Sequence, residues 1–465
     1  MTLKVFEESA AWEAGKEVRE RIDALMGGTD SMRKAGENLL PRFEMECTED
    51  YEKRLACATL YPAYSETVKN MTGRVFYRPI NRDEVAANLQ ADIEDIDLQG
   101  NDLDVFAADW FQNGLAYGLC HALVDYPKTA GLSSRADGTL TERDVKQANI
   151  RPYARLVMPH DVIGWIVERV NNVDKLVQVR IREVAMARDG AYGVTEVERV
   201  RVLEPGRYEL WEKQSSNQSR KSDWVLIDEG VNSLSSIPLV TFYTGRTGML
   251  TAKPPLLELA NMNIKHWQEQ SDQDASVRFA RVRIVYATGL EGDTKLSASA
   301  ESIICLPPGG SIDVVQGSAE SVKVGADSLT KLEEQMRESG ARLLAKKSQS
   351  TKTVAQARSD AIIEQSALGA MAQQLEDAID QVLQLMAEYR GTDLGGHVDV
   401  NDDFDALDDQ SMSAESIIKL VVAGVISEAT AFNECKRRGL ISNELEWAEE
   451  QERILSSGAD HGIPA

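Results

Sequence analysis

The feature that most limits the fold of this chain is a long run of regularly spaced apolar residues. Between Val354 and Tyr389 they recur every three or four residues, which is the spacing of a helix with one buried face. The stripe consists of Leu368, Met371, Leu375, Ile379, Val382, Met386 and Tyr389. At about 1.5 Å per residue an uninterrupted helix would span roughly 54 Å, with Gly369 as its expected kink point. The sequence therefore predicts a largely helical protein that contains one very long helix.

A bare, positively charged segment precedes this helix. Residues 345–360 read AKKSQSTKTVAQARSD, and the stretch KKSQSTKT contains three lysines and no apolar side chain. Apolar residues return at helical spacing on both sides, so the segment is predicted to be a loop between two helices. Taken alone, it is interpreted as a solvated interhelical loop.

The spacing of apolar residues changes within the first half of the chain. Residues 1–125 read mostly helical, and residues 150–245 hold β-rich runs separated by turns, which is typical of an antiparallel meander. The helical stripes are Tyr64, Val68, Met71 and Val75, and then Leu103, Phe106, Trp110 and Gly114. Gly114 and Gly118 permit close approach of another backbone, but glycines at this spacing are usually incidental in a soluble chain.

A β insert between two helices is predicted in the second half. A helix over residues 255–282 starts at prolines and has a polar second half, QEQSDQDAS, which suggests neighbours on several faces. Short β-like runs follow within residues 283–326, with a turn at Pro307–Gly310, and helix then resumes. After the long helix, the tail reads as three short helices.

Composition limits the class of protein. The chain has 465 residues, 43% of them hydrophobic and 27% charged, as expected of a globular protein with more than one core-bearing unit. Its five cysteines are scattered, which suits a reducing compartment and cytosolic synthesis. No apolar run approaches the roughly 20 residues that cross a bilayer, and the N-terminus lacks the cationic start of a signal peptide. Neither secretion nor membrane insertion is expected.

No catalytic or metal-binding motif is present in the sequence. Patterns for phosphate-binding loops, nucleotide-binding glycines, serine nucleophiles and zinc-binding helices are all missing. The five histidines are widely separated and fit packed or solvated roles. An acidic cluster, Asp399, Asp402, Asp403, Asp405, Asp408 and Asp409, lacks the central glycine and closing glutamate of an EF-hand and is interpreted as a solvated turn. We therefore expect no enzyme activity, cofactor or metal, although cation binding by the cluster stays open.

Four stretches of sequence are similar, in order, to successive landmarks of one protein family. They read LPRFEMECTEDYEKRLACATLY, PPLLELANMNIKHWQEQSD, ESGARLLAKKSQSTKTVAQARSDAIIEQSALGAMA and AGVISEATAFNECKRRGLI. Through these stretches and the order of its elements, the chain resembles the portal proteins of tailed bacteriophages over most of its length. None of the stretches is diagnostic by itself, so the resemblance rests on their order.

This resemblance implies a fold class and a division of the chain. The fold would be α+β and mainly helical, with the portal-type wing, stem, clip and crown. The wing would comprise residues 1–254, including the β-rich section at 150–245, and residues 355–410 with the long helix and a strand. Stem helices at 255–282 and 327–345 would flank a clip at 283–326. A tunnel loop at 346–354 and a crown with the C-terminal tail at 411–465 would complete the chain.

The resemblance also implies a function and partners. Twelve subunits would form a homo-oligomeric ring at one capsid vertex of a virion, assembled in the host cytoplasm. Double-stranded DNA would pass through its channel during packaging and ejection, without sequence-specific contacts. The terminase large subunit and a head-tail adaptor would dock on the clip, and major capsid and scaffolding proteins would contact the ring. No membrane is implied, and the portal itself would hydrolyse nothing.

Particular residues take roles through the same resemblance. The DNA-facing tunnel loop would present Lys346, Lys347, Ser348, Gln349, Ser350, Thr351 and Lys352. The docking turn of the clip would consist of Pro307, Pro308, Gly309 and Gly310. Since the formal net charge is -24, the channel would repel phosphates and hold DNA off its wall, while a few lysines make weak contacts.

Two other classes of protein stay open at this point. One is an acidic helical scaffold or head-tail adaptor without a DNA channel. The other is an enzyme acting on virion or host, with residues 150–245 as its body. An enzyme would need an acid, base or nucleophile set, and the sequence shows none.

Overall fold

A computed structural model describes most of the chain. The described residues are 4–127, 141–214, 223–232, 234–281, 284–288, 309, 311–315, 319–343, 366–402, 414–437, 440–441, 445 and 447–456. Within them helix and strand are mixed, with helix predominating, and all strand pairs are antiparallel. The predicted mainly helical α+β class is confirmed at this level. None of the helices in these ranges is both long and apolar enough for a bilayer.

The N-terminal part is helical, as predicted. Its helices are α1 (Ala10–Ala14), α2 (Lys16–Met26), α3 (Gly28–Ala35), α4 (Thr48–Cys57), α5 (Ala63–Val75) and α6 (Leu103–Tyr117), with 3-10 turns at Gly36–Asn38 and Ile93–Asp95. Both predicted apolar stripes are buried in α5 and α6. The Asp102 carboxylate caps α6 by accepting a hydrogen bond from the Val105 N–H, 3.0 Å away. Gly118 ends α6 in the left-handed conformation, at φ 87°.

The predicted meander divides between two sheets. The five-stranded sheet has the order β3-β4-β5-β6-β7, formed by Val162–Val170, Val173–Asp189, Gly193–Glu204, Arg207–Gln214 and Asp223–Val231. Strands β2 (Tyr153–Val157) and β8 (Leu239–Tyr243) instead pair with the two edges of β1 (Leu119–Asp125), a strand outside the predicted β-rich range. Because β1 is buried along nearly its whole length, both of its edges need partners. Helix α7 (Glu142–Gln147) and the short pair β9 (Arg246–Gly248) and β10 (Thr251–Ala252) complete this part.

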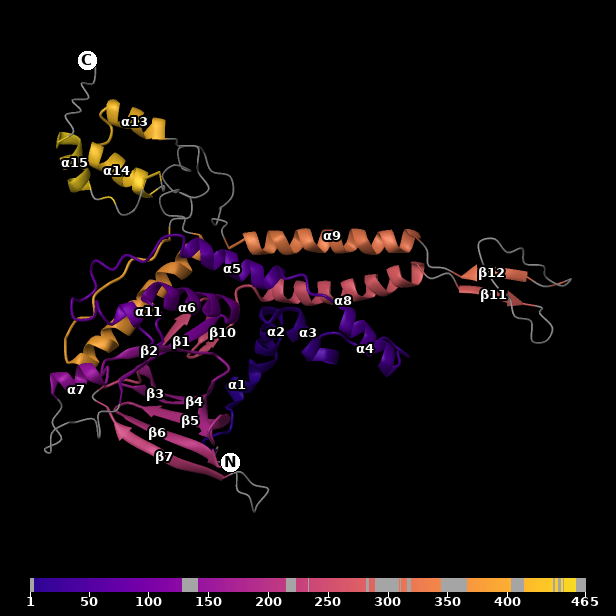
Figure 1. Ribbon diagram of the computed structural model, residues 1–465, viewed down its shortest axis with the longest axis horizontal. Helices are drawn as coiled ribbons and strands as arrows, with labels where there is room; N and C mark the ends of the chain where they lie inside the picture. The colour runs from indigo at the N-terminus through magenta and orange to yellow at the C-terminus, as the bar shows by residue number, and fades with distance from the viewer. Residues whose placement is uncertain are drawn as a thin grey trace.

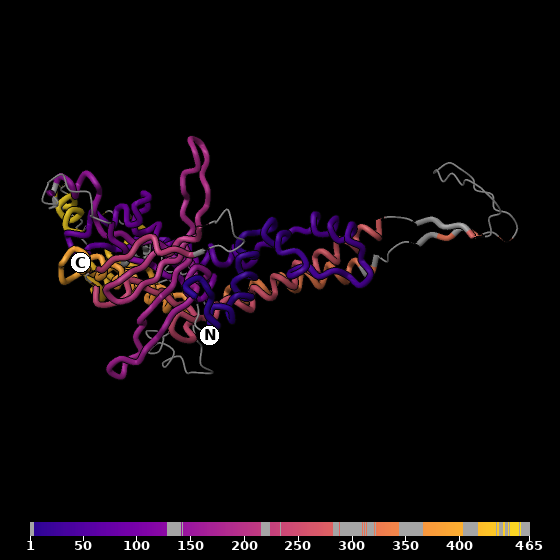
Figure 2. Tube along the Cα trace, turned by 90° about the horizontal axis from the view of Figure 1, so that it is seen from below, coloured from indigo at the N-terminus to yellow at the C-terminus, as the bar shows by residue number. Residues whose placement is uncertain are grey.

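The long strand β4 extends beyond the sheet at both of its ends. Its residues 173–178 pair only with β3, and residues 182–189 pair only with β5. Figure 2 shows the two resulting narrow arms on opposite sides of the body. Their exposed apolar side chains include Val173 on one arm and Met186 and Tyr192 on the other.

A stalk extends from the body in the second half of the chain. It consists of α8 (Leu257–Arg281) and α9 (Ala319–Ala341), which lie side by side, and of the hairpin β11 (Ile284–Thr288) and β12 (Ser311–Val315) at the far end (Figure 1). The first helix and the β insert lie where the sequence predicts them. Helix α9 begins at Ala319 rather than at residue 327, because its first turns already pack against α8 through a Gln273 bond to the Val322 carbonyl.

The prediction of one uninterrupted helix over residues 354–389 is wrong. Helix α11 spans Ala367–Arg390, about 36 Å at 1.5 Å per residue, and α8 is one residue longer. Ser366 has an extended backbone, with ψ 156°, and its Oγ accepts a hydrogen bond from the Gly369 N–H at 3.1 Å. This N-cap starts a new helix, so Gly369 lies in the first turn and is not a kink. Residues 354–365 lie outside the described ranges.

Three short helices follow, as the tail pattern predicts. They are α13 (Ala414–Val422), α14 (Glu428–Arg437) and α15 (Trp447–Ser456), grouped apart from the stalk in Figure 1. The Phe432 and Trp447 rings lie 5.3 Å apart between α14 and α15. The predicted strand after α11 is reduced to single bridges, Asn81 to Asp399 and Val85 to Gly396.

The main core joins α5, α6, α11 and the three-stranded sheet. Gly114 of α6 contacts the buried Phe242 ring of β8 so closely that a Cβ there would lie 2.3 Å from a ring carbon. A Cβ at Gly118 would lie 2.9 Å from the Lys253 backbone. These two glycines are therefore required by packing, and their interpretation as incidental is wrong.

Two glycine substitutions should have opposite effects on stability. Gly114→Ala should lower the free energy of unfolding by about 1–3 kcal/mol, because overpacking Phe242 outweighs the better helix propensity. Gly73→Ala in α5 should raise it by roughly 0.5–1 kcal/mol, because nothing lies within 4 Å of the added methyl group. Denaturant unfolding of both variants beside the parent protein measures this. Equal effects would contradict the packing role of Gly114.

Candidate functional site

The two stalk helices are held together by polar as well as apolar contacts. The Gln273 Nε2 donates to the Val322 carbonyl oxygen at 2.7 Å, and a Cβ at Gly325 would collide with the Gln273 amide. Nearer the body, His266 Nε2 lies 3.3 Å from Glu333 Oε1, with His266 buried. The polar second half of α8 thus has neighbours within its own chain, which accounts for part of the pattern that suggested lateral association.

The base of the stalk is fixed by a fully buried amide on α8. Asn263 Oδ1 accepts from the Tyr64 N–H at 2.9 Å, and Asn263 Nδ2 donates to the Tyr61 carbonyl at 2.8 Å. Tyr64 is the second residue of α5, after the N-cap Pro62 and Ala63, so this amide joins the start of α5 to α8. Both polar ends of the buried side chain are satisfied, and the contact therefore specifies one position of α8.

A buried ion pair fixes the middle of α8 on its other side. Arg54 of α4 forms two hydrogen bonds to the Glu46 carboxylate, at 2.8 and 2.7 Å, and both side chains are only 8% exposed. Arg54 also donates to the Ser271 hydroxyl at 3.3 Å and lies over the Phe43 ring. The hydrogen bonds from Arg54 lower the pKa of Glu46 below its usual value.

The predicted lysine segment itself lies outside the described residues, but both of its ends are described. The described residues stop at Leu343, two residues after α9, and resume at Ser366. The Leu368 N–H donates to the Leu343 carbonyl at 3.1 Å, so the two described ends lie together beside the base of the stalk. Lys346, Lys347, Ser348, Gln349, Ser350, Thr351 and Lys352 all belong to residues 344–365, between these ends.

The predicted docking turn is described only in part. Gly309 lies in a turn at φ 94°, a conformation that favours glycine, whereas Pro307, Pro308 and Gly310 lie outside the described residues. The strands on either side pair from Ile284–Val315 to Thr288–Ser311. The pairing places Gly309, two residues before Ser311, at the end of the hairpin farther from α8 and α9.

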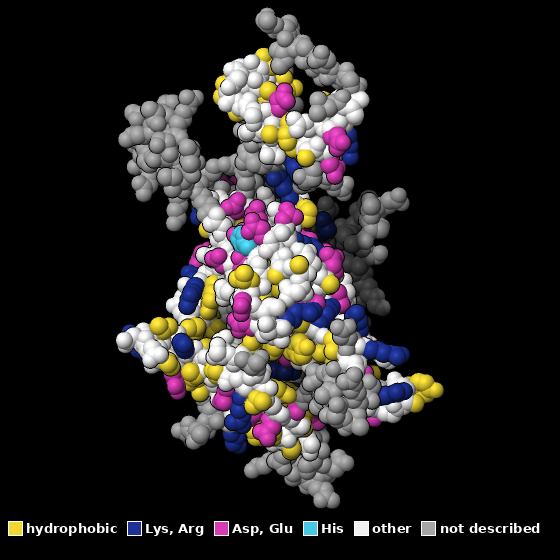
Figure 3. Space-filling view, turned by 90° about the vertical axis from the view of Figure 1, so that its left-hand side faces the viewer, with side chains coloured by type: hydrophobic (Ala, Val, Ile, Leu, Met, Phe, Trp, Pro, Cys, Tyr) yellow, Lys and Arg dark blue, Asp and Glu magenta, His cyan; other side chains and the backbone are white. Residues whose placement is uncertain are grey.

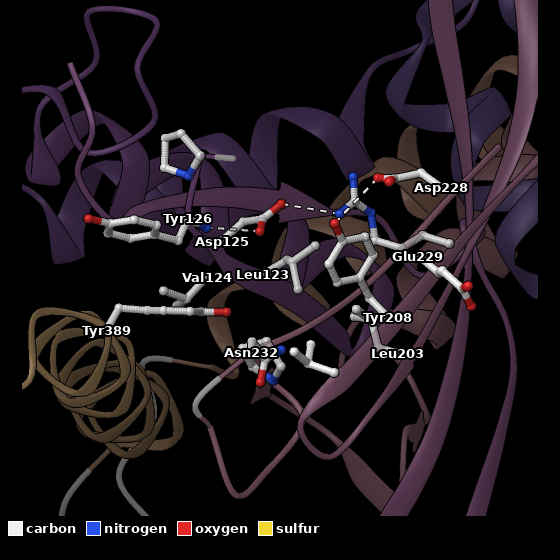
Figure 4. A pocket seen from close by; sticks show the side chains of 14 residues that line it. Leu123, Val124, Asp125, Tyr126, Leu203, Tyr208, Asp228, Glu229, Asn232 and Tyr389 are labelled. Carbon is white, nitrogen blue, oxygen red and sulfur yellow. Dashed lines mark hydrogen bonds and ion pairs between the residues drawn. The ribbon is translucent and has the colours of Figure 1, made fainter. Parts of the chain in front are cut away.

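A cavity that the described residues form lies elsewhere, and no sequence pattern pointed to it. It measures about 590 Å³ and lies between the end of β1, the five-stranded sheet and the C-terminal end of α11. Figure 4 shows the Tyr126 and Tyr389 rings stacked at one side, with centroids 5.7 Å apart, and Tyr208 close to Asp228 at the other. Burial raises the pKa of Tyr389, so its hydroxyl stays protonated.

A network of ion pairs lies beside this cavity. Arg201 bonds Asp125 at 3.2 Å and Glu183 at 2.6 Å, and Arg155 contacts the same Glu183 carboxylate. Burial raises the pKa of Glu183, but the two arginines outweigh burial and lower it. Each of these charges already has a partner, so the network is suited to joining β1, β2 and the sheet.

One histidine lies close to two carboxylates, and the search for metal-binding motifs in the sequence did not find this group. His397 Nδ1 lies 2.6 Å from Asp380 Oδ2, and its Nε2 lies 3.8 Å from Glu376; these two carboxylates are one turn apart on α11. The bond to Asp380 raises the pKa of His397. Figure 3 shows acidic side chains gathered round a histidine on the face opposite the stalk. Within the described residues, however, no group of histidine, cysteine and carboxylate side chains is arranged to hold a metal ion.

The predicted acidic cluster is described only at its start. Asp399 forms the backbone bridge to Asn81, and Asp402 Oδ2 accepts from the Gln373 amide at 2.8 Å. Asp403, Asp405, Asp408 and Asp409 lie outside the described residues.

Comparisons with known proteins give one family model and several distant solved structures. A family model described as a domain of unknown function (DUF4055) matches residues 255–390, which span the stalk and α11. A search of curated proteins found no match. Solved structures with some likeness include chains from the neck of a native gene transfer agent particle computed with C12 symmetry and from the neck of an empty particle computed with C6 symmetry. A third comes from the virion of the native particle.

These structural likenesses are distant. The native neck chain is 9% identical with a TM-score of 0.39, and the empty neck chain is 11% identical with 0.38; each comparison covers 79% of this chain and 88% of the other. The virion chain is 11% identical with a TM-score of 0.38 and coverage of 91% and 99%.

The ion pair between Arg54 and Glu46 should make the stability of the protein depend on pH. Glu46→Gln should lower the free energy of unfolding at pH 7 by on the order of 2 kcal/mol, because Arg54 loses its charged partner. Since the folded-state pKa of Glu46 is lowered, the pair stabilises fully above the unfolded value near 4.5 and loses its effect as the pH falls below it. The difference between parent and variant should therefore vanish in acid.

The control is Glu52→Gln, an exposed change on the same helix as Arg54. It should leave stability nearly unchanged at both pH values. A Glu46→Gln deficit that persists equally at about pH 3, below the unfolded-state pKa of a glutamate, would show that the carboxylate charge is not its cause.

Proposed function

We propose that this chain is a portal-type subunit of a tailed-phage-like particle. Twelve copies would form a ring at one capsid vertex of the virion, with a central channel through which double-stranded DNA is packaged and ejected. The observation that carries the proposal is the stalk: two helices with a β-hairpin tip project from the body, and a lysine-rich segment starts and ends at their base. This is the order of stem, clip and tunnel loop that the sequence resemblance implies.

Ring formation is supported by surfaces that one chain leaves without neighbours. The stalk exposes Val324 and Phe279, and the arms of β4 expose Met186 and Tyr192 on the side opposite Val173. A chain with different exposed surfaces on two sides suits head-to-tail contacts, which close into a ring when the rotation permits.

A DNA channel is supported by the distribution of charge. An acidic chain repels a duplex, so the ring would not hold DNA firmly through counterion release. Lys346, Lys347 and Lys352, together with the hydroxyl and amide groups between them, would supply weak phosphate contacts that read no sequence. The duplex would be centred and still able to move.

The other parts of the proposal concern partners. The hairpin tip, with the turn at Pro307, Pro308, Gly309 and Gly310, would dock the terminase large subunit and later a head-tail adaptor. Major capsid and scaffolding proteins would contact the body of the ring. The subunit would carry no catalytic step of its own and require no cofactor.

Two alternatives are distinguished by the assembly itself. An acidic scaffold or adaptor would form a rod or a small oligomer without an axial channel. An enzyme would act as a compact particle and would need a reactive site.

Assembly is the first test of the proposal. Negative-stain microscopy and light scattering of the full chain at micromolar concentration should show a closed ring with an open axial channel. A monodisperse monomer across salt and pH would exclude the portal role, and rods would favour the scaffold.

The lysine segment gives a second test. Replacing Lys346, Lys347 and Lys352 together by Gln should leave ring assembly and thermal stability nearly unchanged, because the segment offers no apolar side chain to a core. DNA packaging or retention should change, and more so at low salt, because screening weakens exposed charge contacts. Normal packaging and retention at every ionic strength would leave the segment as a solvated loop.

A further inference from the structure

A groove between α5 and α9 combines three cationic residues without an acidic one. Its volume is about 570 Å³, and its lining residues are Thr67, Lys69, Asn70, Met71, Gly73, Arg74, Arg337, Gly340 and Ala341. Within the described part of the chain, then, no carboxylate lines this groove. Acidic residues outnumber basic ones by 75 to 51 in the whole sequence, so such a surface is unlike the chain around it.

Two of the three cations have no acidic partner within the described ranges. Lys69 of α5 and Arg337 of α9 are both exposed, and neither forms an ion pair with any described residue. Their charges therefore remain available to an anion in solution. Arg74 lines the same groove, and its carbonyl oxygen accepts from the Asn401 side chain at 3.4 Å.

The floor of the groove is kept open by glycines. Nothing lies within 4 Å of the position that a Cβ at Gly73 would take, whereas a Cβ at Gly340 would lie 3.0 Å from the Thr67 side chain. Gly340 lets the two helices approach, and Gly73 leaves the space above them free. An extended chain of charged groups can thus reach both α5 and α9.

The groove also adjoins the start of the lysine segment. Gly340 and Ala341 belong to the groove, and Leu343, two residues later, is the last described residue before the lysine segment; its carbonyl accepts from the Leu368 N–H. Lys346 follows Leu343 by three residues, so chain length alone keeps the two Cα atoms within about 11 Å of each other. Positive charge therefore recurs along the sequence from Arg337 to Lys352.

We infer that this groove, through Lys69 and Arg337 on its two walls, binds the phosphate backbone of double-stranded DNA. This inference rests on the proposed function and adds to it a rigid contact on helices, distinct from the lysine segment. A groove of this size takes a stretch of one backbone strand and not a whole duplex. Lysine and arginine on its two walls make charge-assisted bonds to phosphate oxygens that position the duplex without reading its bases.

A polyanion made of protein is the competing occupant. The acidic residues from Asp399 to Asp409 follow directly along the chain from the neighbourhood of Arg74, and a carboxylate-rich segment also complements three cations. Phosphate backbone is favoured because the groove lies beside the lysine segment, which has the same preference. The two occupants lead to different effects of groove substitutions on DNA binding and on thermal stability.

The test measures affinity of the full-length protein for a fluorescent duplex of random sequence over a range of salt concentrations. Lys69→Gln with Arg337→Gln should weaken binding several-fold at low salt and reduce the slope of log K against log salt by about 2, because two phosphate contacts are lost. Lys323→Gln with Lys331→Gln removes equal charge from exposed positions of α9 outside the groove and should leave the slope nearly unchanged.

A second pair of variants keeps the cations in place. Gly73→Glu puts a carboxylate into open space and should also weaken binding, whereas Gly73→Gln, of nearly the same size, should weaken it less. The lysine-segment variant should add to the effect of the groove variants. Microscopy of every variant shows whether the ring persists, and this separates failure of the inference from failure of the proposed function.

Three results would overturn the inference. One is an unchanged affinity and slope in the groove variants. Another is an equal loss in the α9 control, which would mean that only net charge matters. The third is unchanged DNA binding together with a lowered melting temperature in the groove variants, which would assign the groove to an acidic segment of protein.

Discussion

The hydrogen bonds of Asn263 fix the relation between body and stalk on which the rest of the structure depends. A fully buried amide is costly unless both of its ends are bonded, and here they meet the backbone on either side of Pro62. Sliding α8 by one residue would break both bonds. One polar side chain therefore sets the register of α8 against α5. Because α9 packs along α8, the position of α9 is fixed by the same contact.

The anchoring of α8 to the body extends from its start to just past its middle, and this asymmetry shapes the molecule. Asn263, Trp267 and Ser271 are buried, whereas Phe279 near the far end is 45% exposed. Polar contacts such as Gln273 to Val322 hold the outer half to α9 without requiring a core. A helix pair held in this way can project from the body without large apolar surfaces of its own. The β11–β12 hairpin is thereby presented well away from the main core, as Figure 1 shows.

The spacing of apolar residues predicted the secondary structure correctly where a helix or strand buries a regular stripe. It failed where a single side chain determines where a helix begins. The stripes of α5 and α6 were predictable because each helix buries one face along its length, and the five-stranded meander was predictable from its β-rich runs separated by turns. The helix start at Ser366 was not predictable, because the apolar spacing in the sequence continues across this residue, whereas its hydroxyl caps α11. The α5–α9 groove was also hidden, since Lys69 and Arg337 lie far apart in sequence and only packing brings them together. The proposed roles of the lysine segment came from resemblance and charge alone.

Net charge is a poor guide to what this surface can bind. The net charge of -24 determines the electrostatic potential far from the protein. At about 0.15 M salt the screening length is near 8 Å, so the strength of a direct contact depends on the charged groups close to it. The groove with Lys69 and Arg337 is such a local exception, and so is the sequence from Lys346 to Lys352. A few positive side chains surrounded by acidic ones bind a polyanion weakly, hold it at a defined distance and release it readily. If the same positive charges were spread evenly over the surface, the more numerous acidic residues would cancel them. No defined binding position for a polyanion would then remain.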